Sequence, residues 1–514
     1  MIFTKKYKFF LFISAFVLVI NMLIMNEYTT ILNEVESDFL LDVQTLLGKG
    51  ELNPDAKALL PVWVDSIMCK SLRFNEFGLR LPSVLILLMT FFGFYFFGKK
   101  IFGLKTTVVT LLVLGSSFLP VNLSKFAIGD VWLFGVQLMS FVLMILYLKQ
   151  PIGKWKWGVW FFVVLGAMIH PLSMLIWSVG LWGYLQIFHP KGKNLRGLVL
   201  LPLLVIVYLP LWYFGLISLE MPHFLMGIGS EYFKYFFVIA LLAVLPWFGF
   251  LPASLWDLIQ KLRKKEELAI INLGWILFAI FSQSMIIVAA FSFLIAKNLI
   301  AYFDKNYPYR RLVKGFTLIN MIFTFFGLFA LLLGGFMNFQ GAGYRSVFGI
   351  SILYWFGSMA AVLGLFMHKN SLVTGGMAVS GLMFTWLFWL QVNPLMESQR
   401  NFPKQVFQEL KTQGVGRVGA NLKITELYHL DSDSVFYQKN MKVYLQELNV
   451  KTVAVDSIKM VSMTSKDQNA FAALSTPFFE KLPSGHIFLE NKKYTITGGK
   501  GFLKTEEEYQ LVEF

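Results

Sequence analysis

Cysteine, acidic residues and charge of either sign are scarce in this sequence. Among 514 residues there is one cysteine, Cys69, which excludes an internal disulfide and any multi-cysteine metal or redox motif. Charged residues make up 15% of the chain against 56% hydrophobic ones, and this balance excludes an ordinary soluble globular protein. Glycine-rich segments occur, but none stands in the strand–loop–helix context of a phosphate-binding loop.

Basic residues outnumber acidic ones by 45 to 30, which gives a net charge of +15. A surplus of this size can indicate a nucleic-acid-binding protein, but here Lys and Arg collect in short loops between long apolar runs. That placement is typical of a membrane protein that crosses the bilayer several times. We therefore expect membrane lipid as a partner, and no nucleic acid.

Apolar runs close to the ~20 residues that cross a bilayer recur as far as residue 392. The first has a basic start but no small-residue cleavage site, so we interpret it as a retained helix rather than a signal peptide. Treating two tight hairpins, at His170-Pro171 and at Ser282–Ser284, as helix breaks predicts about thirteen spans, and merging both predicts about eleven. The predicted spans are 8–26, 81–98, 104–121, 131–148, 157–170, 172–188, 197–217, 233–256, 268–282, 284–303, 315–336, 348–367 and 371–392.

The positive-inside rule orients the chain. With the N-terminus in the cytoplasm, the loops that are rich in Lys and Arg fall on the cytoplasmic side. The opposite side then holds a long first loop, 27–80, and a tail, 393–514. We expect an integral protein of the inner (plasma) membrane with an extracytoplasmic tail, which is periplasmic if the source is a Gram-negative bacterium.

The tail differs in composition from the rest of the chain, because long apolar runs stop at Asn393. Residues 403–411 predict an amphipathic helix, and 451–456 and 486–489 predict strands. The length of the tail, residues 393–514, suits one small α/β domain. In the first loop, apolar residues spaced three and four apart predict a helix over 37–47, and a second short helix is expected at 60–72. Both are expected to lie along the membrane surface.

The stretch KALLPVWVDSIMCKSLRFNEFGLRLP, residues 57–82, carries the most specific pattern. A Lys is followed by a Trp, an N-E-F segment and an Arg at the mouth of the next span. This arrangement, with NEFGLRLPS at 75–83, resembles the first large loop of lipid-linked-sugar glycosyltransferases of the GT-C superfamily. The resembling branch contains the aminoarabinose transferases of lipid A and the protein O-mannosyltransferases. Segments 123–132 and 393–404 resemble the second outer loop of that family and its passage into the tail domain.

The resemblance implies a GT-C-like fold, in which residues 1–392 form a polytopic α-helical membrane domain with about 13 transmembrane helices and 393–514 a small extracytoplasmic α/β domain. It implies a glycosyltransferase that moves a sugar from a polyprenyl-phosphate donor to a lipid, glycan or protein acceptor on the outer face, by direct displacement with inversion. Such a transfer needs a carboxylate to take the acceptor's proton, which typically contributes about 10²–10⁴-fold. Cationic groups or a metal must stabilise the departing phosphate.

The resemblance places the catalytic carboxylates at Glu36, Asp38 and Asp130. The family's Asp-Glu pair maps onto Val35-Glu36, so the Glu is present and the Asp is replaced, unless the register shifts by one to Glu36-Ser37. Asp38 is the alternative base. Asp130 would orient the acceptor or a cation. A divalent metal is a candidate cofactor, with Glu36 and Asp130 as candidate ligands. The alternatives are a solvated acidic helix face for Glu36 and Asp38, and a helix N-cap for Asp130.

The same resemblance places the donor phosphate against Lys57, Arg80 and His170. Lysine suits a phosphate as a compact point charge, and an arginine at the mouth of a span needs a partner or water. His170 stands where relatives carry a Lys, and Ser282–Ser284 stands where they carry an aromatic and basic string. The alternatives are a snorkelling Lys57, a structural Arg80 and a buried His170 with ordinary hydrogen bonds.

Two other classes of function stay open. The missing family residues favour a catalytically degenerate GT-C-like scaffold that serves as a structural subunit of a cell-envelope complex. A transporter is the third class, although transporters usually carry ionisable groups at the bilayer midplane rather than at span ends. We expect the tail, 393–514, either to cover the cavity or to dock an envelope protein. The sequence assigns no particular sugar, acceptor, metal or oligomeric state.

Overall fold

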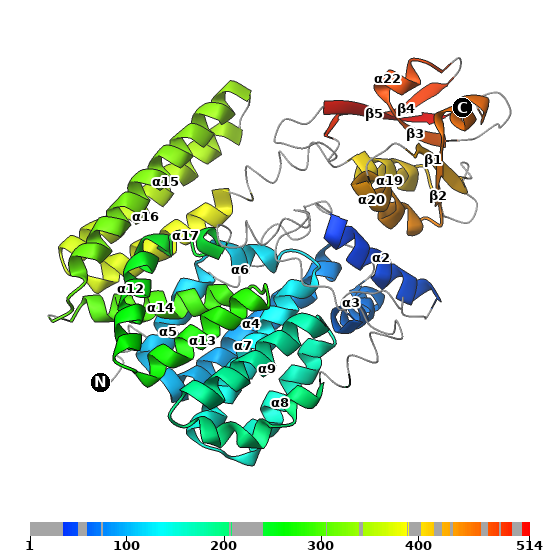
Figure 1. Cartoon of the computed structure of the whole chain (residues 1–514). Helices are drawn as coiled ribbons and strands as arrows, with labels where there is room; N and C mark the ends of the chain where they lie inside the picture. The colour runs from blue at the N-terminus through cyan, green and yellow to red at the C-terminus, as the bar shows by residue number, and fades with distance from the viewer. Residues whose placement is uncertain are drawn as a thin grey trace. The chain divides into compact units, whose positions relative to one another are not determined.

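The computed structural model divides into two compact units (Figure 1). Unit 1 contains Met1–Asn26, Pro54–Val64 and Arg80–Gln391. Unit 2 contains Glu27–Asn53, Asp65–Leu79 and Val392–Phe514. The structure describes residues 34–49, 59–72, 76–204, 207, 240–304, 306–338, 343–387, 389, 402–415, 424–431, 435–463, 471–482, 485–495 and 506–513.

Unit 1 is built from apolar helices. Helices occupy the predicted spans between 81 and 188 and between 268 and 387. Both tight hairpins are breaks between helices, because α8 ends at Ala167 before α9 starts with Pro171, and α13 ends at Phe281 before α14. The helices are α4 (Glu76–Phe102), α5 (Leu104–Gly115), α6 (Phe118–Leu123), α7 (Gly129–Lys149), α8 (Gly153–Ala167), α9 (Pro171–Phe188), α12 (Leu251–Arg263), α13 (Glu267–Phe281), α14 (Ile286–Tyr302), α15 (Arg310–Asn338), α16 (Gly343–Phe366) and α17 (Asn370–Leu387).

The predicted count of about thirteen spans is not confirmed. Among the described residues, four helical segments are long and apolar enough to cross a bilayer, namely α4, α7, α9 and Gly349–Phe366 of α16. Helices α5, α13 and α14 are apolar but shorter. The predicted span 8–26, and most of 197–217, lie outside the described residues. The span predicted at 233–256 ends in α12, whose last turn carries Lys261 and Arg263 and runs past the predicted boundary.

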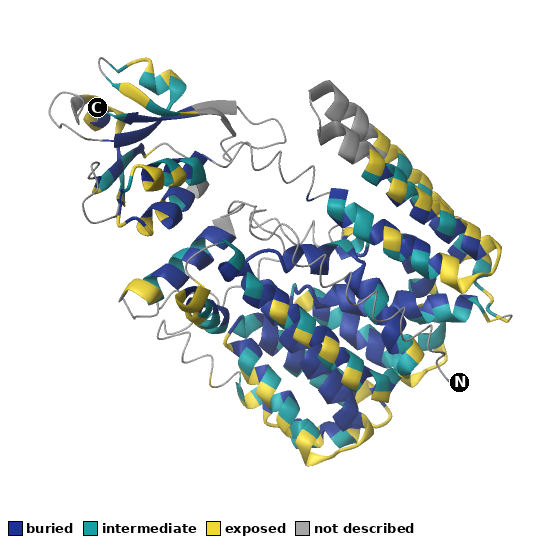
Figure 2. Cartoon of the chain, turned by 180° about the vertical axis from the view of Figure 1, so that it is seen from behind, coloured by how far each residue is buried: buried dark blue, intermediate teal, exposed yellow. Residues whose placement is uncertain are grey.

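Helix α7 is the centre of unit 1. Its residues are buried from Gly129 to Leu148, and Figure 2 shows the same concentration of buried residues inside the helical bundle. A helix that is apolar on all sides has to be covered on all sides. At Gly135 a β-carbon would lie 2.5 Å from Oγ1 of Thr90 on α4, so glycine allows these two helices to pack closely.

Unit 2 contains a mixed five-stranded sheet in the order β2-β1-β3-β5-β4. Strand β1 pairs in parallel with β2 and β3, whereas β5 is antiparallel to β3 and β4. The predicted small α/β tail is therefore present. Its elements are α19 (Phe402–Thr412), β1 (Glu426–Leu430), α20 (Val435–Gln446), β2 (Lys451–Val455), α21 (Ser457–Met463), β3 (Phe471–Ser475), α22 (Thr476–Phe479), β4 (His486–Thr495) and β5 (Glu506–Glu513).

Both helices expected in the first loop are present, as α2 (Glu34–Lys49) and α3 (Leu59–Leu72). The apolar stripe of α2 is buried at Phe39, Leu40 and Val43, but Leu47 near its end is exposed. Helix α3 exposes Trp63 and Ile67, as a helix lying along a membrane surface would. Helix α2 packs against α20, so the contacts of unit 2 join the first loop to the tail.

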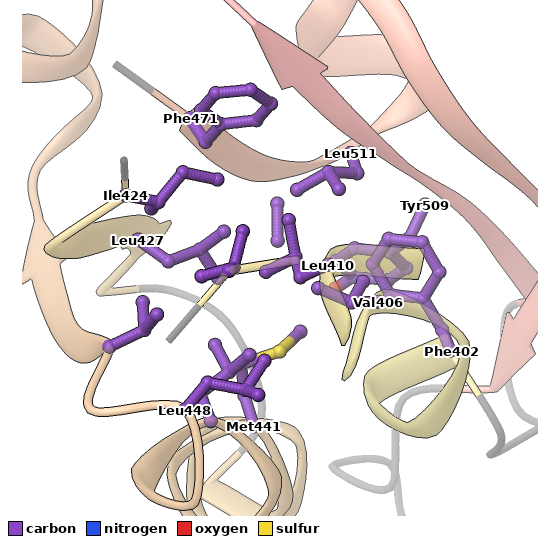
Figure 3. Packing of buried hydrophobic residues seen from close by; sticks show 14 residues of the cluster. Phe402, Val406, Leu410, Ile424, Leu427, Met441, Leu448, Phe471, Tyr509 and Leu511 are labelled. Atoms are coloured by element: carbon purple, nitrogen blue, oxygen red, sulfur yellow. The ribbon is translucent and has the colours of Figure 1, made fainter. Parts of the chain in front are cut away.

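The core of the tail lies between α19, α20 and one face of the sheet (Figure 3). Residues Phe402, Val406 and Leu410 repeat every four positions, which places them on one side of α19. They meet Leu427 of β1 and Phe471 of β3. This packing holds α19 and α20 on the same face of the sheet.

Replacing Leu427 with alanine should lower the free energy of unfolding of the tail by about 2–5 kcal/mol, because the removed methyl groups leave a cavity in this core. Hydrogen–deuterium exchange of the β1 and β3 amides in the full-length protein measures the loss. Gln408→Ala, at an exposed position of α19, is the control and should change that free energy by less than about 0.5 kcal/mol. Equal exchange in the two variants would contradict the assigned core.

Candidate functional site

The two candidate bases of the first loop differ in their surroundings on α2. The Glu36 side chain is 1% exposed, although it lies in the first turn of the helix. Asp38 forms an ion pair, because the Lys439 ammonium of α20 lies 2.8 Å from its Oδ1 and 3.0 Å from its Oδ2. The carboxylate of Asp38 is therefore engaged with the tail, and Glu36 is the buried acid of the pair.

Two further polar contacts fix α2 to α20. The Ser37 hydroxyl donates a hydrogen bond to Oδ1 of Asn440, and both residues are buried. The Gln44 amide donates to the backbone carbonyl of Val443 at 2.7 Å. Together with the Asp38–Lys439 pair, these contacts cover two turns of α2, and they flank Glu36 on its C-terminal side.

Glu76, from the N-E-F string, is an anchor for the tail. Its Oε1 lies 2.8 Å from the Lys404 ammonium of α19 and accepts a hydrogen bond from the Tyr444 hydroxyl at 3.3 Å. Glu76 lies in the string 75–83 and Lys404 ends the segment 393–404, and the sequence pattern assigns neither residue a role. The two strings carry opposite charges, which would allow an ion pair. A sequence pattern, however, does not show that two residues so far apart in the chain are in contact.

Unit 1 brings two cations together where α4 meets the segment between α6 and α7. Arg80 and Lys125 are each 1% exposed. The guanidinium of Arg80 lies 6.0 Å from the ring centroid of Phe126, and the Lys125 ammonium lies 5.2 Å from that of Trp389. The rings of Phe126 and Trp389 are 5.7 Å apart, so the two cations share one aromatic surface.

The neighbouring side chains hold this cationic cluster in place. The Trp389 indole N–H donates a hydrogen bond to Oδ1 of Asn122, whose own amide donates to the carbonyl of Phe118 one turn back. Asn122 lies in α6, so the short helix positions Trp389 against Lys125. Sequence reasoning included Lys125 in a resembling segment but did not select it as a site residue.

Burial, together with the nearby positive charge of Arg80, lowers the pKa of the Lys125 ammonium to about 7. A lysine with this pKa changes its charge near neutral pH. A bound phosphate would favour its charged form, because an opposite charge close by stabilises the ammonium. The cluster is therefore suited to an anion and is poorly suited to a cation.

Asp130 lies in the first turn of α7, where the helix dipole favours a negative charge. The N-cap position is occupied by Ile128, so Asp130 is not the N-cap that the alternative interpretation expected. The side chain is 7% exposed. It follows Lys125 by five positions, which places an acid and a buried cation close together in the chain.

The remaining predicted positions are His170, the hairpin at Ser282–Ser284, and Lys57. His170 occupies the N-cap position of α9 and is half-buried. At the second hairpin, the Ser173 hydroxyl of α9 donates to the carbonyl of Ser282 at 2.8 Å, and Ser284 donates to Gln137 Oε1 of α7. Serines that tie this hairpin to α7 and α9 thus replace the expected aromatic and basic string. Lys57 lies outside the described residues.

The predicted divalent metal finds no site within the part of the chain that the structure describes. There, no three side chains of His, Cys, Asp and Glu come together to hold an ion. The two candidate ligands belong to different units, Glu36 to unit 2 and Asp130 to unit 1. We therefore derive no chemical step through a metal, and its requirement stays a prediction.

No protein-family model matches the sequence, and no curated protein matches it significantly. Solved structures do match. The crystal structure of ArnT from Cupriavidus metallidurans bound to undecaprenyl phosphate has a TM-score of 0.64 at 15% identity, covering 98% of this chain and 98% of that one. The same protein in the apo state gives 0.62 at 16% identity, covering 99% and 98%.

An archaeal oligosaccharyltransferase from Archaeoglobus fulgidus in the apo form matches less well, with a TM-score of 0.47 at 10% identity over 88% of this chain and 65% of that one. ArnT is an aminoarabinose transferase, and both proteins belong to the GT-C superfamily. At these identities the ArnT likeness establishes a shared fold over nearly the whole chain. The GT-C resemblance seen in the sequence is thereby confirmed for the fold.

Proposed function

We propose that this chain, which has the fold of ArnT, is a membrane glycosyltransferase that moves a sugar from a polyprenyl-phosphate donor to an acceptor at the outer face of the membrane. The observation that carries the proposal is the buried pair of cations, Arg80 and Lys125, on a shared aromatic surface. Two cations held side by side form a positively charged site of the kind that binds a phosphate. The ArnT structure with undecaprenyl phosphate supports a lipid phosphate as that anion.

The reaction we propose is a direct displacement. An acceptor hydroxyl or amine attacks the anomeric carbon, its proton passes to a carboxylate, and the bond from the anomeric carbon to the phosphate oxygen breaks. Inversion follows from a single displacement. We assign the base to Glu36, which matches the Glu of the resembling family and is 1% exposed. Asp38, which pairs with Lys439, is the alternative base. Asp130 is assigned to orienting the acceptor.

The departing polyprenyl phosphate carries away the electron pair of the broken bond. We assign its stabilisation to Arg80, Lys125 and, from the sequence resemblance, Lys57. Positively charged donors that are already in place when the charge develops lower the barrier without further reorganisation. Arg80 and Lys125 suit this role, because both are buried beside aromatic rings, and the Trp389 ring beside Lys125 is held by a hydrogen bond to Asn122.

Turnover of the donor by the purified protein tests the proposal. The protein in lipid nanodiscs would receive undecaprenyl-phosphate-linked sugars, one at a time, with a total envelope lipid extract as acceptor, and released undecaprenyl phosphate would be measured. We expect release that depends on the protein and is reduced by Asp130→Asn. Absence of release with every donor would overturn the proposal.

The degenerate scaffold is the second candidate, and one observation favours it. The Ser284 hydroxyl donates to Gln137 of α7, and the Ser282 hydroxyl donates to the carbonyl of Ala279 in α13, where the resembling family carries aromatic and basic residues. The same experiment separates the two candidates. Binding of undecaprenyl phosphate without release from any sugar donor supports a binding subunit, whereas release supports the transferase.

A further inference from the structure

Helix α2, which carries Glu36, is held by the tail through side chains that no part of the proposed chemistry uses. The three contacts are Ser37 to Asn440, Asp38 to Lys439, and Gln44 to the carbonyl of Val443. All three partners lie on one helix, α20. We propose that Lys439 and Asn440 are positioning residues that set the placement of Glu36 for the reaction, an inference that rests on the proposed function.

Geometry supports a positioning role. Ser37 and Asp38 directly follow Glu36, so the contacts act on the same helical turn that carries the carboxylate. The Ser37–Asn440 hydrogen bond is buried, and a buried bond of this kind fixes both direction and register. Gln44 holds the helix nearly two turns farther on, which restrains rotation of α2 as well as its translation.

Helix α20 is itself rigidly held. Met441 and Leu445 lie fully buried in the core of the tail, on the same helix as the residues that hold α2. Tyr444 donates to Glu76, which also pairs with Lys404 of α19. The core of the tail therefore fixes α20, and α20 in turn fixes both α2 and the first turn of α4.

The placement of a catalytic group has a large effect on the reaction rate, since a displacement of about 1 Å can lower the rate about 10²-fold. We therefore expect Asn440→Leu to lower kcat about 10–100-fold while the KM for the donor changes less than about threefold. Lys439→Ala should act in the same direction with a smaller loss. Lys442→Ala, at an exposed position of the same helix, is the matched control and should leave kcat unchanged.

A charge exchange gives the sharpest test. Asp38→Lys and Lys439→Asp should each lower kcat, and the double variant should recover at least tenfold relative to the worse single variant, because the ion pair is restored in reverse. Recovery is impossible if the Asp38 carboxylate takes part in the chemistry. Failure of the double variant to recover, or a kcat unchanged by Asn440→Leu, would overturn the positioning role.

Amide hydrogen exchange of α2 in the same full-length variants needs no activity. Asn440→Leu should speed exchange over residues 34–49, whereas Lys442→Ala should not. If the wild-type protein releases no undecaprenyl phosphate, the proposed function and this inference both fail, even if exchange changes as expected. If the wild type is active and α2 exchange and kcat are insensitive to Asn440, only the present inference fails.

Discussion

Glu36→Gln is expected to lower kcat for donor turnover by about 10²–10⁴-fold, the usual contribution of a positioned general base. The substitution keeps the shape of a side chain that is 1% exposed, so packing should be preserved, but the amide cannot accept the acceptor's proton. Release of undecaprenyl phosphate under saturating donor gives kcat directly. The affinity for undecaprenyl phosphate should stay within about threefold of wild type, because the base takes part in the transition state rather than in donor binding.

Asp42→Asn is the matched control, since it removes a different carboxylate from the same helix and is expected to change kcat less than threefold. Asp38→Asn distinguishes the alternative base. A fall of 10² or more for Asp38→Asn, with Glu36→Gln near wild type, would exchange the two assignments. The charge exchange with Lys439 would then fail to recover activity as well.

The sequence predicted those features that depend on local pattern. The strand at 451–456 and the helix at 403–411 are predicted from the periodicity of apolar residues and from the residues that begin and end each element. The structure contains both, as β2 and α19. The helix breaks at His170 and at Ser282–Ser284 were also visible, because Pro171 can only begin a helix and polar residues interrupt an apolar run. Each of these features is decided within a few neighbouring residues.

Contacts between distant segments were not predictable in the same way. Nothing in the pattern of α2 indicates that Asp38 pairs with Lys439, because either residue reads equally well as part of a solvated helix face. The role of Glu76 was missed for the same reason, since its partner Lys404 lies in a separate string near the start of the tail. Periodicity reports which residues are buried but not which residues they meet.

Lys125 was predictable in part, because the sequence shows the residue but not its surroundings. Its segment was recognised, but the sequence gives a loop lysine every reason to be exposed. The structure buries it beside Arg80 because α6 folds as a short helix and its Asn122 orients Trp389 against the lysine. The sequence thus shows that a lysine is present, but it does not predict that the lysine is buried. Burial is what brings its pKa near neutrality.

That pKa leads to the second large expected effect, in the binding of undecaprenyl phosphate. Lys125→Met should weaken binding about 10–100-fold at pH 6.5, since a charge-assisted hydrogen bond to a phosphate contributes about 1.5–3 kcal/mol. Lys125→Arg keeps a charge that does not titrate in the accessible range. The comparison between wild type and Lys125→Arg across pH therefore isolates the ionisation of the lysine from that of the phosphate, which is common to both proteins.

The sign of the pH effect follows from which form binds. The phosphate binds the ammonium, and in the free protein the pKa of Lys125 is about 7. Below that pH the lysine is already charged, so the ratio of the wild-type to the Lys125→Arg affinity should be constant. Above it, the site must take up a proton before binding, so the ratio should fall about tenfold for each further pH unit. Calorimetry in buffers of different ionisation enthalpy should show the proton uptake at pH 8 in the wild type and not in Lys125→Arg. A ratio that stays constant from pH 6 to 9 would contradict the lowered pKa of Lys125. Unchanged binding of undecaprenyl phosphate by Lys125→Met would show that the phosphate does not bind at Lys125, and the assignment of the buried cations to the donor would then fail.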